Sequence, residues 1–137
     1  MNEHKTPRGN KAKNDKDSIL ADTKNLLTVL LAAIQEMPKI ERIDGAAVEM
    51  RRAALNIIRH FSIAKECQEV RVVHIREMLG EFGILLATFE ICVARGLLTS
   101  ETQLKLAMQL ERIEEGVRKW RSATRALKSQ ERQAVTP

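Results

Sequence analysis

Tyrosine is absent from this chain of 137 residues, which also has only three phenylalanines and one tryptophan. Aromatic and β-branched residues favour strands, whereas the alanine, leucine, glutamate, lysine and arginine that dominate here favour helices. Six glycines and three prolines leave few places for turns. The composition therefore predicts an all-α fold with a few long helices in one domain.

Cysteine and long apolar runs are also scarce. The two cysteines, Cys67 and Cys92, lack C-x-x-C spacing, so neither a disulfide framework nor a zinc site is indicated. No stretch reaches the roughly 18 apolar residues that span a bilayer, and the polar N-terminus has no apolar segment typical of a signal peptide. We expect a cytoplasmic protein without a membrane partner.

Motifs for catalysis are missing as well. The sequence has no glycine-rich phosphate loop and no G-x-S-x-G turn. A di-iron bundle needs Glu-x-x-His pairs, but Ile57 and Arg71 stand three residues before His60 and His74. His74 and Glu77 share a helix face, where a surface salt link is the usual outcome. We therefore expect no enzyme activity, no catalytic residue, no metal and no cofactor.

Apolar residues at helical spacing predict four helices within residues 17–128, arranged as an antiparallel up-down four-helix bundle. The first starts at Asp17 or Ser18 and stops before Pro38. Residues 38–45 form a connector, in which Asp44 is the expected N-cap of the second helix. A break at about 64–69 precedes the third helix. Gly96 ends the third helix, and a capping box of Ser100 and Gln103 opens the fourth. Residues 1–16 are predicted to be a disordered basic segment, and 129–137 a flexible tail.

The same spacing predicts which side chains face the core. One strip on the third helix, formed by Gly80, Gly83 and Ala87, is small enough to let a neighbouring helix approach closely, at about 1 kcal/mol of helix propensity per glycine. The predicted positions are Ile19, Thr23, Leu26/Leu27, Leu30, Ile34 and Met37 on the first helix, then Val48, Arg51/Arg52, Leu55, Ile58 and Ser62 spaced along the second, then Ile75, Met78/Leu79, Phe82, Leu85/Leu86, Phe89 and Cys92/Val93 on the third, then Leu106, Leu110, Ile113, Val117, Trp120, Thr124 and Leu127 on the fourth.

Positive charge gathers near the C-terminus. Residues 116–137 hold six basic residues and one acidic residue, whereas residues 19–115 hold 12 and 14. Five of the six basic residues recur at steps of three and four and fall on one helix face, which we call the basic stripe. It consists of Arg118, Arg121, Arg125, Lys128 and Arg132. Such a column fits a polyanion, although a solvated helix surface is the ordinary alternative.

Three further basic residues complete the candidate nucleic-acid-binding set. Lys119 adjoins the stripe, while Arg51 and Arg52 form a second basic spot that ion pairing to Glu49 would explain equally well. Phosphate contacts rather than base stacking are expected, because Trp120 shares the core-facing side of its helix. The predicted partner is RNA or DNA.

Two segments resemble a known family. MRRAALNII (50–58) and ICVARGLLTSE (91–101), with Gly80 between them, are similar to the small four-helix proteins encoded by intervening sequences of bacterial 23S rRNA genes. A related branch is the accessory variability determinant (Avd) of diversity-generating retroelements. The similarity covers residues 20–127. HFSIA (60–64) and Ile84 depart from the rRNA branch, while Trp120 and the basic C-terminus look more like Avd.

The Avd resemblance implies a homo-oligomer of five subunits that binds a reverse transcriptase and its RNA template. Two alternatives stay open: a protein of the rRNA intervening-sequence type, and an oligomeric protein-interaction scaffold whose charge is incidental. The scaffold reading rests on the excess apolar surface of the first and third helices. A basic helix lying on anionic lipid is a weaker reading.

Overall fold

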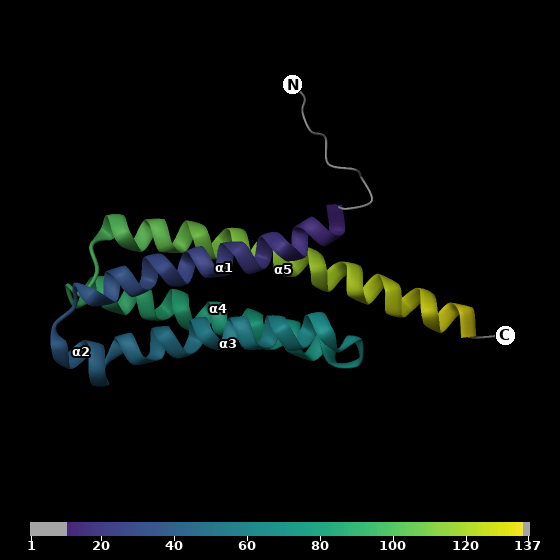
Figure 1. Cartoon of the computed structure of the whole chain (residues 1–137), viewed down its shortest axis with the longest axis horizontal. Helices are drawn as coiled ribbons and strands as arrows, with labels where there is room; N and C mark the ends of the chain where they lie inside the picture. Colours follow the sequence, from purple (N-terminus) through teal and green to yellow (C-terminus); the bar gives the residue numbers. More distant parts are fainter. Residues whose placement is uncertain (1–10, 136–137) are drawn as a thin grey trace, which may run out of the picture.

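Four long helices make up most of the chain in the computed structural model, which describes residues 11–135 (Figure 1). Two short elements, α2 and the 3-10 helix η2, connect them, and the described range contains no strand. The prediction of an all-α chain is therefore confirmed. The elements are α1 (Lys11–Gln35), α2 (Lys39–Asp44), α3 (Ala46–Glu66), η2 (Gln68–Val70), α4 (Arg71–Ala94) and α5 (Ser100–Val135).

The outer helices are longer than expected. α1 begins at Lys11, six residues before Asp17, because the lysines and alanine of this stretch are good helix formers with no glycine or proline among them. Residues 11–16 are thus helical, and residues 1–10 of the expected disordered segment lie outside the described residues. α5 continues to Val135, so residues 129–135 of the predicted flexible tail are helical, since these last turns also consist of helix-compatible residues.

The connector after α1 contains the short helix α2, and Asp44 is not the N-cap that the sequence predicted. Gly45, not Asp44, is the N-cap of α3, and no side chain caps that position. Instead Glu41 accepts a hydrogen bond from the Ala46 backbone N–H at 3.4 Å and pairs with Arg95 at 3.0 Å. The ion pair ties this connector to the end of α4.

The two remaining turns agree closely with the sequence. α3 ends at Glu66 and α4 starts at Arg71, so the predicted break at 64–69 is confirmed. Gly96 has φ +74°, and the N–H groups of Gly96 and Leu97 donate to the carbonyls of Val93 and Cys92, as in a Schellman motif. The predicted glycine cap is therefore confirmed.

The hydroxyl that caps α5 belongs to Thr99, not Ser100. Thr99 Oγ1 accepts a hydrogen bond from the Thr102 backbone N–H at 3.1 Å, and Ser100 is already the first residue of the helix. The predicted capping box was thus one residue out of place. Adjacent serine and threonine are both good N-caps, so the sequence alone did not choose between them.

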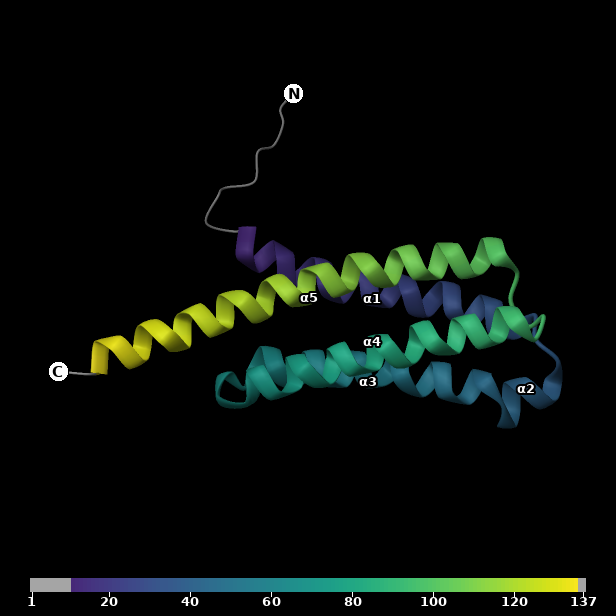
Figure 2. The same ribbon diagram turned by 180° about the vertical axis from the view of Figure 1, so that it is seen from behind.

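Successive long helices lie side by side: α1 packs on α3, α3 on α4 and α4 on α5, and α5 returns to pack on α1 (Figures 1 and 2). The core runs along the centre, and the positions predicted on the first and third helices are buried except Leu27, Leu79, Leu86 and Val93, which are half-buried. The positions named along the second helix are not the core of α3: Leu55 is exposed, and the buried residues are Ala47, Met50, Ala53, Ala54, Ile57, Phe61 and Ala64. On α5 the predicted positions from Leu106 to Thr124 are buried, but Leu127 is half-exposed.

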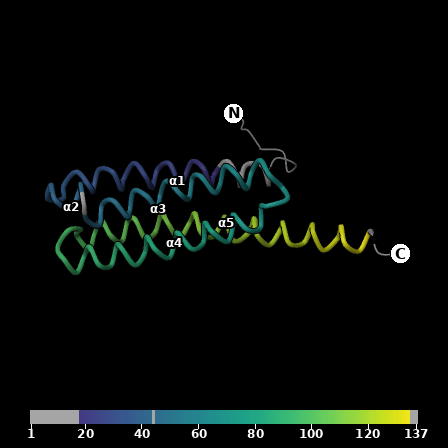
Figure 3. Tube along the Cα trace, turned by 90° about the horizontal axis from the view of Figure 1, so that it is seen from below, coloured from purple at the N-terminus to yellow at the C-terminus, as the bar shows by residue number. Residues whose placement is uncertain are grey.

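Leu127 is exposed because α5 outruns the other helices. Thr124 is the last buried residue of α5, and the helix then continues past the α3–α4 turn in all three views (Figures 1, 2 and 3). We call residues 125–135 the overhang. At 1.5 Å per residue it extends roughly 16 Å. No side chain from Arg125 to Ala134 is buried.

The small-residue strip on α4 is not covered within the chain. Gly80, Gly83 and Ala87 are exposed, and no described atom of a neighbouring element lies within 4 Å of where a Cβ would stand on either glycine. The prediction of a close helix contact there is wrong for a single chain, because α3 and α5 pack on the other sides of α4. None of the described helices is both long enough and apolar enough to cross a bilayer.

Candidate nucleic-acid interface

The basic stripe lies on α5 and crosses the point where this helix leaves its neighbours. Regular helix geometry from Ser100 to Val135 keeps the five residues on one side, as the spacing predicted. Arg118, Arg125 and Arg132 are exposed, whereas Arg121 and Lys128 are partly buried. The stripe therefore combines a section inside the helix assembly with a section on the overhang.

Inside the assembly, Arg118 of the stripe and the adjoining Lys119 pair with carboxylates of the same helix. Arg118 contacts Glu114 at 2.6 Å, and Lys119 contacts Glu115 at 3.4 Å. Exposed pairs of this i,i+4 type contribute only about 0.3–0.5 kcal/mol each, but they reduce the positive potential around them. Arg121 differs: its Nε atom is buried and has no hydrogen-bond partner among the described residues.

Two cations of the overhang, Arg125 and Lys128, are not paired. Among the side chains that the structure describes (18–43 and 45–134), no carboxylate forms an ion pair with either of them. The exposed Arg132 lies two turns beyond Arg125 on the same side of the helix. This section of the stripe is the part best placed to contact an anion.

The second basic spot serves the fold instead. Arg52 pairs with Glu49, as the alternative reading held, and Arg51 donates to the Arg42 carbonyl at 2.8 Å. Both residues are near the start of α3, at the opposite end of the molecule from the overhang (Figure 1). The structure thus does not bring Arg51 and Arg52 together with the basic stripe.

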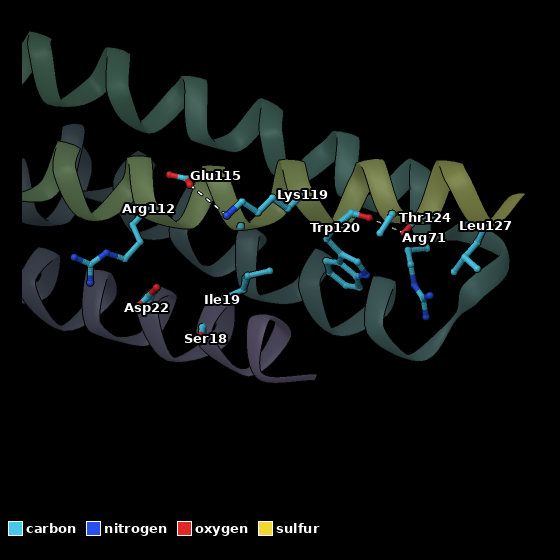
Figure 4. Close-up of a pocket in the computed structure, with 12 residues that line it drawn as sticks. Ser18, Ile19, Asp22, Arg71, Arg112, Glu115, Lys119, Trp120, Thr124 and Leu127 are labelled. Atoms are coloured by element: carbon cyan, nitrogen blue, oxygen red, sulfur yellow. Dashed lines mark hydrogen bonds and ion pairs between the residues drawn. The ribbon is translucent and has the colours of Figure 1, made fainter. Parts of the chain in front are cut away.

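A hollow of about 580 Å³ adjoins the stripe, and sequence reasoning missed it (Figure 4). Its walls come from α1, α4 and α5, and a pattern within one helix cannot reveal a cavity that three helices share. The lining residues are Ser18, Ile19, Asp22, Arg71, Arg112, Glu115, Gly116, Lys119, Trp120, Ala123, Thr124 and Leu127. Gly116 allows α1 to approach here, because a Cβ on it would stand 3.1 Å from Ile19 Cγ1.

Trp120 forms part of the wall of this hollow and is only 8% exposed. Its ring centroid is 5.6 Å from that of Phe61, and the Arg71 guanidinium carbon lies 5.6 Å from the indole centroid. Arg71 is itself held by the Ala64 carbonyl, to which its Nε donates at 2.6 Å. The indole is therefore a core group, as its position on the helix predicted, and not an open platform for a base.

The hollow carries both signs of charge. Arg71, Arg112 and Lys119 face it together with Asp22 and Glu115 (Figure 4). Lys119 and Glu115 already satisfy each other. An anion would meet carboxylates as well as cations there, so the overhang offers the simpler site for phosphate.

A histidine pair joins α3 to α4 and was also missed. The Nδ1 atoms of His60 and His74 are 2.8 Å apart, so one imidazole donates a hydrogen bond to the other. His74 thus has a ring partner in place of the expected link to Glu77. Burial lowers the pKa of His60, and the charge of His74 acts in the same direction. Among the described residues, no group of three or more histidine, cysteine, aspartate and glutamate side chains is arranged to hold a metal ion.

Comparison with known proteins found no matching family model, no matching characterised protein and no matching solved structure.

Proposed function

We propose that this chain is a non-enzymatic nucleic-acid-binding accessory protein, which holds the phosphate backbone of RNA or DNA on the overhang of α5. The observation that carries the proposal is the position of Arg125, Lys128 and Arg132. They lie on one side of a helix that extends beyond its neighbours, and Arg125 and Lys128 have no ion pair with any side chain that the structure describes. An exposed column of cations attracts phosphates and releases their counterions.

The proposed mode of binding is backbone contact with little sequence readout. The overhang contains no aromatic side chain, and Trp120 is packed against Phe61. Stacking of bases on aromatic rings, which gives single-strand binders much of their affinity, is therefore not part of the proposal. Recognition by shape and charge remains.

We further propose an antiparallel up-down four-helix bundle as the frame for this site. The cyclic order of contacts, with each helix beside its neighbours in sequence and α5 beside α1, supports that topology. The short connections between the helices favour it as well.

The resemblance to Avd supports a more specific form of the proposal. In that form the chain is a cytoplasmic homo-oligomer that binds a reverse transcriptase and its RNA template. Two free thiols, Cys67 and Cys92, are compatible with a reducing compartment. The alternative branch, proteins encoded by 23S rRNA intervening sequences, shares the motifs at 50–58 and 91–101. Gene neighbourhood distinguishes the two: a neighbouring reverse transcriptase gene would support the Avd form, and an rRNA operon would support the alternative.

The test neutralises the overhang without touching the core. A triple variant, Arg125→Gln, Lys128→Gln and Arg132→Gln, is compared with a control that removes three charges elsewhere, Lys24→Gln, Arg59→Gln and Lys105→Gln. All six side chains are exposed or, for Lys128, partly exposed. Binding is measured by fluorescence anisotropy with labelled single-stranded RNA and duplex DNA over a range of salt.

We expect the overhang variant to lose at least about tenfold in affinity and to lower the slope of log K against log salt by about 2–3, since each phosphate contact contributes roughly 0.7–0.9. The control should retain most of the wild-type slope. Equal losses in the two variants would mean that net charge, not the overhang, is responsible. If wild-type protein binds neither nucleic acid, the scaffold reading replaces this one.

A further inference from the structure

Charge is unevenly spread along the hollow beside Trp120. Figure 4 shows Arg71 and Leu127 at one end of it. Both acidic residues of its described lining, Asp22 and Glu115, lie on the other side of Trp120 in this view (Figure 4). An acid group at the Arg71 end would therefore meet a cation without a carboxylate of the lining beside it.

Two carbonyl groups at the end of α3 hold the Arg71 guanidinium in place. Its Nε donates to the Ala64 carbonyl at 2.6 Å, and its Nη2 donates to the Lys65 carbonyl at 3.2 Å. Both bonds come from one edge of the planar group, whose central carbon is 5.6 Å from the centroid of the Trp120 ring. A side chain that is already fixed in this way loses little conformational freedom when it binds a ligand.

The other edge of the Arg71 guanidinium, formed by Nη1 and Nη2, is left for a ligand. Among the described residues, Nη1 has no hydrogen-bond acceptor. Arg71 also has no ion pair with any side chain that the structure describes (18–43 and 45–134). Two parallel N–H groups on such an edge match the two oxygens of a carboxylate. The hollow thus presents a fixed fork that is suited to one acid group.

The walls next to this fork are suited to an apolar body. Ile19, Trp120, Ala123 and Leu127 contribute to them. The volume of about 580 Å³ lies within the roughly 300–1,000 Å³ of small-molecule sites, in which apolar walls surround a few polar groups that fix orientation. We infer that the hollow binds a small monocarboxylic acid with an apolar body, such as a medium-chain fatty acid, whose carboxylate accepts from Arg71. The inference does not depend on nucleic-acid binding.

Tryptophan fluorescence tests the inference, because Trp120 is the only tryptophan and lines the hollow. The full chain is titrated with decanoate, decanol and decylammonium, which share an apolar chain and differ in charge. Decanoate should change the emission saturably, with a Kd below about 1 mM, and the other two should bind at least about tenfold more weakly, because only the carboxylate can pair with Arg71. No saturable change with decanoate, or equal affinity for decanoate and either analogue, would overturn the inference.

Arg71→Met removes the fork and keeps an apolar side chain in its place. This change also removes two hydrogen bonds to α3, so the readout is the ratio of decanoate to decanol affinity within the one variant, with folding checked by circular dichroism. The preference for decanoate should disappear. The control Arg76→Met, an exposed arginine of the same helix outside the lining, should keep that preference. A preference that persists in Arg71→Met would contradict the role of this guanidinium.

A second pair of variants fills the hollow without changing the core. Ala123→Phe places a large side chain in its wall, and Ala126→Phe places the same side chain outside the lining; both alanines are exposed. Thermal stability should be similar in the two variants, because the change in helix propensity is the same. Ala123→Phe should weaken decanoate binding at least about tenfold by occupying its space, whereas Ala126→Phe should not. Equal affinities in the two variants would place the bound acid outside the hollow.

Discussion

The docked section of α5 and the overhang carry one stripe of cations but have different surroundings. From Leu106 to Thr124, every third or fourth side chain is buried against α1 and α4; from Arg125 to Ala134 none is buried. The three-and-four spacing of the basic stripe runs through both sections. Periodicity thus reports which residues share a helix side, whereas the length of the neighbouring helices decides where that side becomes a core.

The functional proposal depends on the same difference. Inside the assembly, Arg118 has Glu114 one turn away. On the overhang Arg125 has no such partner among the described residues. One helix therefore provides both a docked section that fixes its position and an extended section whose charge is available.

The largest expected effect is the difference in unfolding free energy between a substitution in the docked section of α5 and one in the overhang. Leu110→Ala removes a fully buried side chain and should lower the free energy of unfolding by about 2–5 kcal/mol. Leu127→Ala, with half of that side chain already in solvent, should change it by less than about 1 kcal/mol. Urea unfolding followed by circular dichroism measures both. Similar losses would mean that the overhang is packed in solution.

A smaller effect is expected at the start of α5, where the docked section begins. Thr99→Ala removes the hydroxyl that accepts from the Thr102 N–H, and should destabilise the protein by about 1 kcal/mol. Ser100→Ala, one residue later, should be nearly neutral, because no hydrogen bond of its hydroxyl is part of the cap. The same unfolding assay checks the pair. A larger loss for Ser100→Ala would restore the capping box expected from sequence.

The smallest expected effect is on the pH dependence of folding stability, which His60 between α3 and α4 should influence and the overhang should not. Because burial lowers the pKa of His60 in the folded chain, the unfolded chain binds more protons between that pKa and the ordinary value near 6.5. Stability should be constant above pH 6.5 and decline as the pH falls below it, until His60 is protonated in both states. Thermal unfolding of wild type and His60→Gln measures this.

His60→Gln should flatten the decline of stability at low pH, while the single substitution Arg125→Gln on the overhang should leave that decline unchanged. A decline of equal size in His60→Gln would assign the pH dependence to carboxylates instead.

The sequence predicted the positions of the helices better than the contacts between them. Spacing at three and four residues identified most of the core on α1, α4 and α5, and Gly96 identified the end of α4, because both depend on neighbours in the chain. The same spacing missed the core of α3, where small alanines such as Ala53 and Ala54 are buried and Leu55 is exposed. The capping hydroxyl was assigned to Ser100 instead of Thr99, since both side chains suit an N-cap.

What the sequence could not provide were contacts between distant residues. The His60–His74 pair, the Glu41–Arg95 ion pair and the hollow beside Trp120 each join separate helices. The stripe was found by spacing, but only the ends of α1 and α4 show that Arg125 lies beyond the helix assembly while Arg118 lies within it.

The unequal surroundings of the two thiols have a practical consequence. Cys67, in the turn between α3 and η2, is exposed, whereas burial raises the pKa of the Cys92 thiol inside the core. A maleimide dye at neutral pH should therefore label Cys67 alone, because thiolate and access are both required. The unaltered chain thus accepts a single fluorophore at the end where α5 departs, and energy transfer from the one tryptophan to that dye can follow the arrival of a ligand there.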